Sequence, residues 1–365
     1  RSAWILDANT CSNNTMLSRS LGKSRVLSSL RSSSGSLSSR SLGSTSNDAP
    51  MGPLEESVTK LANGDDREAA AVAKMLAQAR IDDTRTGRPF LWGGDALLTD
   101  LGVEKGYWLQ PKVTEALKKL DPDFELAGAK VGATNAAGQK RLGLTEPFFG
   151  PLYRKTVLLA DSDKPISHSA LCTRGIEAEW AFILSKDIPV RKEGEKLFTR
   201  EDVSKFVHAV APSIEVTGTR FKSPAAKWLF LADGAGNGSV ILGAKSLWRD
   251  VNDPEVLRAD SLPVKTYLGN ELKCEGDGSQ VLGHPLEGLL WLANKTNRSV
   301  LHAGDVILSG AANGNLSFPP TSLPSSVTVE FFQWGRLELT IDAPVSEKGA
   351  PFSAVGARPF KLSLK

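Results

Sequence analysis

The sequence predicts an α+β protein with a small helical N-terminal part, residues 54–125, followed by a mixed, strand-rich body, residues 126–345. The first part combines strong helix formers with apolar residues at spacings of three and four. After residue 125, short apolar runs alternate with Gly, Pro, Asp and Asn, a texture typical of strands and turns. The body shows neither an internal repeat nor a regular βαβ alternation, and residues 346–365 follow it as a C-terminal tail.

Four segments carry the helical signal. Ala69–Ala79 is rich in Ala, Leu, Met, Lys and Gln, and Val113–Leu120 repeats apolar residues at spacings of three and four. In the body we expect helices over Arg200–Val207 and Pro285–Asn294. The second of these begins with a proline, which suits the first turn of a helix.

The strands of the body are predicted from short runs rich in β-branched and aromatic residues. We expect them at Thr156–Ala160, Ile176–Leu184, Ser239–Leu242, Val306–Leu308, Val327–Phe332 and Leu337–Ile341.

Residues 1–50 are expected to be a disordered extension. From Met16 to Asn47 the chain is rich in Ser and Leu and has basic but no acidic side chains, which is typical of an organellar transit peptide. That interpretation predicts the mitochondrial matrix, with a plastid as the alternative. A generic Ser/Arg-rich tail, which buries too little apolar surface to order itself, would instead leave the protein in the cytoplasm. Both interpretations exclude the segment from the fold.

Charge and composition exclude several classes of partner. The net charge is +3, from 44 basic and 41 acidic residues, so a nucleic-acid partner is not indicated. No run approaches the roughly 20 apolar residues that span a bilayer, so we expect no membrane association. Cys11, Cys172 and Cys274 have no CxxC spacing and no paired count. That pattern suits a reducing compartment and gives no thiolate metal site.

Two glutamates stand out in the strand predicted at Ile176–Leu184. Alternation places Glu177 and Glu179 on one face, which continues with Ala181 and Ile183. An apolar continuation favours an enclosed pocket, where adjacent anions are costly without a cation. Oxygen ligands alone select Mg²⁺ or Mn²⁺ rather than zinc. The alternative is a solvated strand edge.

A third glutamate, Glu215, lies alone among the apolar residues of Val210–Val216. An unpaired buried carboxylate is disfavoured. Glu215 is therefore either a third metal ligand, which would leave positions for a chelating substrate, or the partner of Arg220 or Lys222 in a salt bridge.

Six blocks, in order over roughly residues 68–342, carry a family resemblance. They are Lys130–Thr134, Leu142–Gly150, Ile176–Glu179, Pro212–Val216, Gly283–Leu286 with Trp291–Ala293, and Ala303–Gly310. With them the chain resembles the 2-keto-4-pentenoate hydratase and 4-oxalocrotonate decarboxylase branch of the fumarylacetoacetate hydrolase superfamily. The resemblance implies a fumarylacetoacetase C-terminal-like β-roll or barrel body and a homo-oligomer.

The resemblance also implies a site and a chemistry. Glu177, Glu179 and Glu215 match the ligands of Mg²⁺ or Mn²⁺, which in this family chelates a small 2-oxo or 2-hydroxydienoate acid and stabilises its enolate. Hydratases then add water, and decarboxylases reach the same enolate by losing CO₂. Lys130 matches the family's active-site lysine, an anion clamp or proton-transfer group, although its pattern alone would indicate a surface lysine. Acylpyruvate hydrolysis and oxaloacetate decarboxylation, found elsewhere in the superfamily, are alternatives.

Some positions depart from the family pattern. Phe148 stands where the family has an acid–base Asp, and Glu146 could substitute only if its loop turned differently. Segments at Ala232–Gly236 and Gly310–Gly314 also differ, which changes the expected substrate-binding set. That set is Lys130, Thr134, Asp233 and Gly310. We therefore expect a changed substrate or reaction, or a degenerate homologue that serves as a structural or binding subunit.

Two further patterns are expected to be structural. Gly234–Gly238 resembles part of a dinucleotide fingerprint, but it runs into a predicted strand rather than a helix. The four histidines show no metal-ligand spacing; they are His168, His208, His284 and His302.

Overall fold

The computed structural model describes residues 53–86, 94–162, 165–169, 173–221, 225–317, 326–342 and 354–362. The predicted extension of residues 1–50 lies outside these ranges. The helices are α1 (Pro53–Ala62), α2 (Ala69–Thr86), α3 (Val103–Leu120), α4 (Ala136–Leu142), α5 (Arg200–Ser204), α6 (Lys227–Ala232), α7 (Pro254–Leu257) and α8 (Pro285–Ala293).

The strands form two sheets. They are β1 (Leu126–Gly132), β2 (Phe148–Tyr153), β3 (Val157–Ala160), β4 (Ile166–Ser169), β5 (Thr173–Leu184), β6 (Val207–Gly218), β7 (Asn237–Leu242), β8 (Pro263–Leu268), β9 (Glu271–Asp277), β10 (Val306–Leu308), β11 (Asn315–Ser317), β12 (Val327–Phe331), β13 (Gly335–Asp342), β14 (Ala354–Val355) and β15 (Ala357–Pro359).

The larger sheet has the strand order β15-β3-β7-β6-β5-β10-β1-β2, and β11 also pairs with β5. Its centre is the long antiparallel pair β5–β6. The sheet curls, because β2 at one end comes close to the turn before β7. A Cβ placed on Gly150 of β2 would lie 2.6 Å from the Cβ of Ala235. The curl brings strands that are not neighbours around a common space.

The smaller sheet, ordered β14-β4-β13-β12-β8-β9, packs on one face of the larger one. The residues of β5 on that face are buried in the same core as residues of β12 and β13. Trp180 of β5 shows the contact, since its ring meets Phe331 of β12 edge-to-face with centroids 5.4 Å apart. The opposite face of β5 contributes Ala181 and Ile183 to a second core. The alternation predicted for this strand is therefore confirmed.

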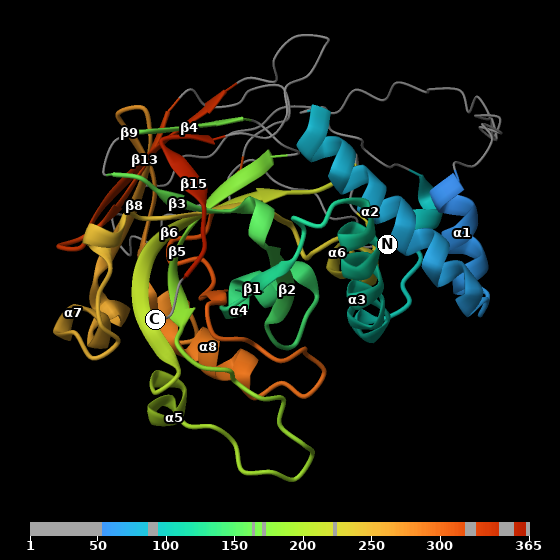
Figure 1. Ribbon diagram of the computed structural model, residues 1–365, viewed down its shortest axis with the longest axis horizontal. Helices are drawn as coiled ribbons and strands as arrows, with labels where there is room; N and C mark the ends of the chain where they lie inside the picture. Colours follow the sequence, from blue (N-terminus) through green and yellow to red (C-terminus); the bar gives the residue numbers. More distant parts are fainter. Residues whose placement is uncertain are drawn as a thin grey trace, which may run out of the picture.

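The helical part is completed by a helix from the body. Helices α1, α2 and α3 share a core with Trp228 and Leu229 of α6 and with Tyr153 of β2. Figure 1 shows these four helices together at the right of the view, away from the smaller sheet at the upper left. The end of the predicted helical part at residue 125 is thus a boundary in the chain but not in the packing.

Most predicted elements are confirmed, and the differences have local causes. The helix predicted at Arg200–Val207 ends at Ser204, and β6 begins at Val207, because the apolar run that follows pairs with β5. Residues 354–362 do more than form a tail, since β14 and β15 extend the two sheets. Cys274 is disulfide-bonded. That bond does not fit the reducing compartment expected from the spacing and count of the cysteines.

Among the described residues, none of the helices is both long enough and apolar enough to cross a lipid bilayer.

Candidate metal centre

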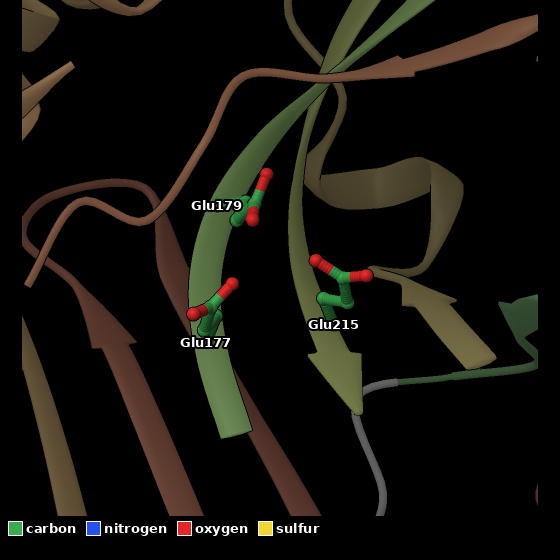
Figure 2. A group of neighbouring side chains, drawn as sticks. All are labelled: Glu177, Glu179 and Glu215. Atoms are coloured by element: carbon green, nitrogen blue, oxygen red, sulfur yellow. The ribbon is translucent and has the colours of Figure 1, made fainter. Parts of the chain in front are cut away.

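The three predicted glutamates come together on the β5–β6 pair. The antiparallel register places Glu177 directly opposite Glu215, and Glu179 follows two residues later on the same face of β5. One carboxylate oxygen from each lies within 4.8 Å of the others. Figure 2 shows the three side chains reaching from two neighbouring strands toward a common space. The register of β5 and β6 therefore brings together Glu177 and Glu215, which are 38 positions apart in the chain.

Burial makes this cluster electrostatically costly. Glu179 and Glu215 are 0 % exposed, and Glu177 is partly buried. Desolvation raises the pKa of Glu179 well above its usual value, and the charges of Glu215 and Glu177 raise it further. Desolvation also raises the pKa of Glu215, against the opposing effect of Lys130. A bound cation would relieve both penalties.

Lys130 reaches the cluster from β1. Its side chain is buried, and its Nζ lies 3.3 Å from Oε2 of Glu215. Burial acts to lower the pKa of Lys130, but the charges of Glu215, Glu177 and Glu179 outweigh it and leave the pKa raised. The pattern that would make Lys130 a surface lysine is therefore misleading. Lys130 is a buried ammonium group beside three carboxylates.

Each glutamate accepts one hydrogen bond from an amide N–H. The backbone N–H of Gly310 donates to Oε2 of Glu179 at 2.7 Å. Asn237 donates to Oε1 of Glu215 at 3.0 Å, and Asn315 donates to Oε1 of Glu177 at 2.9 Å. These donors hold one oxygen of each carboxylate.

Two other carboxylate oxygens lack a hydrogen-bond donor. Oε1 of Glu179 and Oε2 of Glu215 are buried and accept no hydrogen bond from the described residues, although Lys130 lies near the second. Buried polar atoms are almost always partnered in native proteins. One oxygen from each glutamate also lies within 4.8 Å of the others, and a hard divalent cation requires several such oxygen ligands. The residues present therefore fit such an ion.

The position of Phe148 is apolar and close to Lys130. The lysine Nζ lies 5.1 Å from the centroid of the Phe148 ring. The same ring packs edge-to-face on Phe230 at 5.6 Å, and a Cβ added to Gly132 would come within 2.3 Å of it. Phe148 thus brings a phenyl ring, and no ionisable group, next to the ammonium group.

Of the predicted substrate-binding residues, Thr134 and Gly310 lie together at the cluster. Gly310, which bonds Glu179, has a φ of +102°, and a Cβ there would meet the side chain of Thr134 at 2.5 Å. Only glycine suits that conformation and space. Thr134 is buried, so the pair packs closely beside the carboxylate of Glu179.

Asp233 has a different setting. It forms a buried ion pair with Arg220 at 2.8 Å, and Arg80 donates to its backbone oxygen at 2.8 Å. The Arg220–Asp233 pair argues against Arg220 as the partner of Glu215, which instead lies beside Lys130, with Nζ 3.3 Å from Oε2. The other suggested partner, Lys222, lies outside the described residues.

Glu146 lies away from the glutamate cluster. Its side chain is 56 % exposed and pairs with Lys295 at 2.9 Å. The loop therefore presents the carboxylate toward α8 and solvent. We assign Glu146 no part in the chemistry of the buried site.

The histidines have structural settings where their contacts are described. His168 shares a 2.7 Å hydrogen bond with Ser239. His284 caps α8, accepting from the backbone N–H of Leu286. The glycine-rich segment Gly234–Gly238 turns into β7, as predicted.

Sequence reasoning missed Asn237 and Asn315. Asn237 stands inside the segment set aside as a loop, and Asn315 follows the altered stretch Gly310–Gly314. For Asn237 the available signal was an asparagine at the start of an apolar strand, a position where an amide side chain is buried only with a partner. The short strand Asn315–Ser317 offers no such signal.

The comparison with known families matches the description "Fumarylacetoacetate (FAA) hydrolase C-terminal" over residues 135–342. The chain belongs to this family. The predicted strand-rich body is therefore a fumarylacetoacetate hydrolase fold, and the six sequence blocks identified the family correctly.

Two curated relatives of this chain are hydratases. The chain is 31 % identical over 254 residues to a 2-keto-4-pentenoate hydratase of Burkholderia vietnamiensis, covering 68 % of this chain and 88 % of the relative. It is 29 % identical over 251 residues to a 2-oxo-hept-4-ene-1,7-dioate hydratase of Escherichia coli, covering 65 % and 86 %.

A solved structure shares the fold. The 4-oxalocrotonate decarboxylase from Pseudomonas putida G7, complexed with magnesium and adipate, superposes with a TM-score of 0.59 at 19 % identity, covering 76 % of this chain and 98 % of that one. At this identity the match establishes the fold and leaves the reaction to the residues of the site.

Proposed function

We propose that this protein is a divalent-cation-dependent lyase of small 2-oxo or 2-hydroxydienoate carboxylates. The observation that carries the proposal is the cluster of Glu177, Glu179 and Glu215, with oxygens from all three within 4.8 Å. Hydratases of such acids among the relatives, and a decarboxylase bound to magnesium as a structural neighbour, support the same class of reaction.

In this proposal the three glutamates hold Mg²⁺ or Mn²⁺. When bound, the cation supplies Lewis-acid stabilisation of negative charge on the oxygens of a 2-oxo acid. The ammonium group of Lys130 binds a carboxylate of the substrate as a fixed point charge. Gly310 keeps Glu179 in place through its backbone N–H.

Phe148 favours decarboxylation over hydration. Hydration needs a group that moves protons to and from carbon and activates water, and a phenyl ring can do neither. Decarboxylation needs no side chain that activates water or transfers a proton to carbon. The bond to the departing carboxylate breaks, CO₂ leaves, the electron pair moves onto the 2-oxo oxygen, and a proton from solvent completes the product. A decarboxylase of 4-oxalocrotonate or oxaloacetate is therefore the specific reaction we favour within the class.

Purified full-length protein with Mg²⁺ or Mn²⁺ should be assayed on four substrates: 2-hydroxypenta-2,4-dienoate, 4-oxalocrotonate, oxaloacetate and an acylpyruvate. We expect turnover that chelator abolishes and that Glu177→Gln removes, with the carboxylate-losing substrates preferred. Hydrolysis of the acylpyruvate alone would make the protein an acylpyruvate hydrolase. Metal binding without turnover of any substrate, together with co-purification in a larger assembly, would identify a degenerate binding subunit.

We further propose a homo-oligomer imported into mitochondria. The first follows from the family resemblance, and the second from the composition of the segment Met16–Asn47. Sedimentation of the purified protein tests the first. Fluorescent fusions with and without residues 1–50 test the second, and a plastid or cytoplasmic signal from the full chain would contradict it.

A further inference from the structure

Two asparagines approach the glutamate cluster from separate strands. Asn237 begins β7 and is wholly buried; its Nδ2 lies 3.0 Å from Oε1 of Glu215. Asn315 begins β11 and is partly buried; its Nδ2 lies 2.9 Å from Oε1 of Glu177 and 3.1 Å from Oγ1 of Thr217. The proposed function gives neither asparagine a role.

Each amide determines how its carboxylate is oriented. An ionised carboxylate only accepts hydrogen bonds, so the asparagine must present its NH₂ group to it. With Oε1 of Glu215 held by Asn237, Oε2 is the oxygen that faces Lys130, whose Nζ lies 3.3 Å away. The side-chain torsions of Glu177 and Glu215 are thus restricted before any ligand binds.

The backbone of Asn237 is itself held by two buried arginines, Arg80 and Arg220. Arg80 of α2 donates to the backbone oxygen of Asn237 at 3.0 Å and to that of Asp233 at 2.8 Å. Arg220 donates to the same oxygen of Asn237 at 3.4 Å. Arg80 is 3 % exposed, so these bonds form away from competing water. The contacts connect α2 to Glu215 through a single intervening residue.

We propose that Asn237 and Asn315 are positioning residues that set the affinity of the cluster for a small cation and favour Mg²⁺ over Ca²⁺. This inference rests on the proposed metal site. Mg²⁺ demands near-ideal octahedral geometry, whereas Ca²⁺ accepts flexible arrangements of oxygens. Carboxylates held in one orientation therefore favour Mg²⁺, and carboxylates free to rotate lose Mg²⁺ more than Ca²⁺.

The test is calorimetric titration of full-length Asn237→Leu and Asn315→Leu with Mg²⁺ and with Ca²⁺. Leucine has nearly the shape of asparagine without its donor. We expect the Kd for Mg²⁺ to rise about 10- to 100-fold, the usual cost of removing a partner of a ligand, and the Kd for Ca²⁺ to rise less. Asn313→Leu is the matched control, because this buried amide donates to Thr266 rather than to a glutamate.

The possible outcomes distinguish failure of the proposed metal site from failure of the positioning role of the asparagines. A wild-type protein that binds neither cation contradicts the metal site itself. Wild-type binding with unchanged Kd values in both folded variants overturns the positioning role, and so does an equal loss of Mg²⁺ and Ca²⁺ affinity, which would indicate general damage. If Asn237→Leu does not fold by circular dichroism, Asn237→Ser and the less buried Asn315→Leu decide the question.

A second comparison tests the connection to the helical layer. Arg80→Gln should weaken Mg²⁺ binding at least several-fold more than Arg298→Gln. Arg298 is also buried and also donates to backbone oxygens, those of Leu292 and Pro189 among them, but it is not bonded to Asn237. Equal Mg²⁺ affinities in the two variants would remove Arg80 from the proposal.

Discussion

Lys130 and Glu215 form a buried ion pair, with Nζ 3.3 Å from Oε2, although β10 and β5 separate their strands in the larger sheet. The curl of that sheet is what allows the contact. One ammonium group faces three carboxylates, so the pair leaves the cluster with excess negative charge. A cation bound at the cluster would therefore offset this charge and stabilise the folded state.

The charge balance predicts how Lys130→Met behaves. Removing one member of a buried ion pair typically costs about 3–5 kcal/mol, so the metal-free variant should unfold at a lower temperature than wild type. Mg²⁺ would replace part of the missing positive charge and should raise the melting temperature of the variant more than that of wild type. Differential scanning fluorimetry in chelator and in Mg²⁺ measures both shifts. Lys130→Arg, which keeps the charge, is the control, and equal Mg²⁺ shifts in all three proteins would refute the prediction.

Glu179 predicts a pH dependence for the metal-free protein. Its pKa is raised in the folded state, so folding favours the protonated form. The stability from this carboxyl group is fully present below its usual value of 4.5 and is lost as the pH rises through the folded pKa. In chelator, Glu179→Gln should therefore be more stable than wild type at pH 8, and the difference should shrink toward pH 5. Urea unfolding at several pH values tests this, with exposed Glu193→Gln as control. A constant difference across pH would count against it.

Phe148→Asp should shift the reaction toward hydration. It places a carboxylate beside Lys130, where the ring centroid now lies 5.1 Å from Nζ, and general acid–base catalysis is typically worth about 10²- to 10⁴-fold. Losing the buried ring should cost about 3–5 kcal/mol of unfolding free energy. The measurement is the ratio of hydration to decarboxylation rates, compared with Phe148→Leu. A ratio that rises equally in both variants would show that space, not the carboxylate, is responsible.

Gly310→Ala should displace the backbone N–H that bonds Glu179 for two reasons, backbone strain and a clash with Thr134, and these can be separated. The backbone has a φ of +102°, and the new Cβ would meet Thr134 at 2.5 Å. A residue other than glycine at such a positive φ costs on the order of 1–3 kcal/mol. Gly283→Ala is the control, since its φ is +95° but nothing lies within 4 Å of the added Cβ.

Gly310→Ala should therefore lose more stability than Gly283→Ala, and it should also lose Mg²⁺ affinity. Adding Thr134→Ala to Gly310→Ala should recover part of both. If the two glycine variants are equally stable and bind Mg²⁺ equally well, close packing at Gly310 has no part in holding Glu179.

The sequence was most informative where chemistry and periodicity coincide. Glu177 and Glu179 share a strand face, so alternation alone placed them together, and Glu215 was conspicuous as a charge in an apolar run. The family blocks then brought the three into one site. Bringing Lys130 to them depends on the curl of the sheet, which no local pattern encodes.

The contacts that hold the glutamates were harder to predict. Asn315 lies 138 residues from Glu177 along the chain, and an asparagine after a glycine-rich stretch is more typical of a turn than of a buried contact. Glu146 shows the converse error, because a carboxylate near the right position in sequence pairs with Lys295 instead. The register between β11 and β5 decides the contact of Asn315 with Glu177, and that register is fixed by the packing of the whole sheet.

The bond from Arg80 to the oxygen of Asn237 bears on how this protein can be divided. A recombinant fragment cut at the limits of the family match, residues 135–342, would lack β1 with Lys130 and also α2 with Arg80. It would keep Glu177, Glu179 and Glu215. It would lose the positive charge of Lys130 and the hydrogen bond by which Arg80 holds Asn237. The smallest autonomous unit of this chain therefore begins before its recognisable domain does.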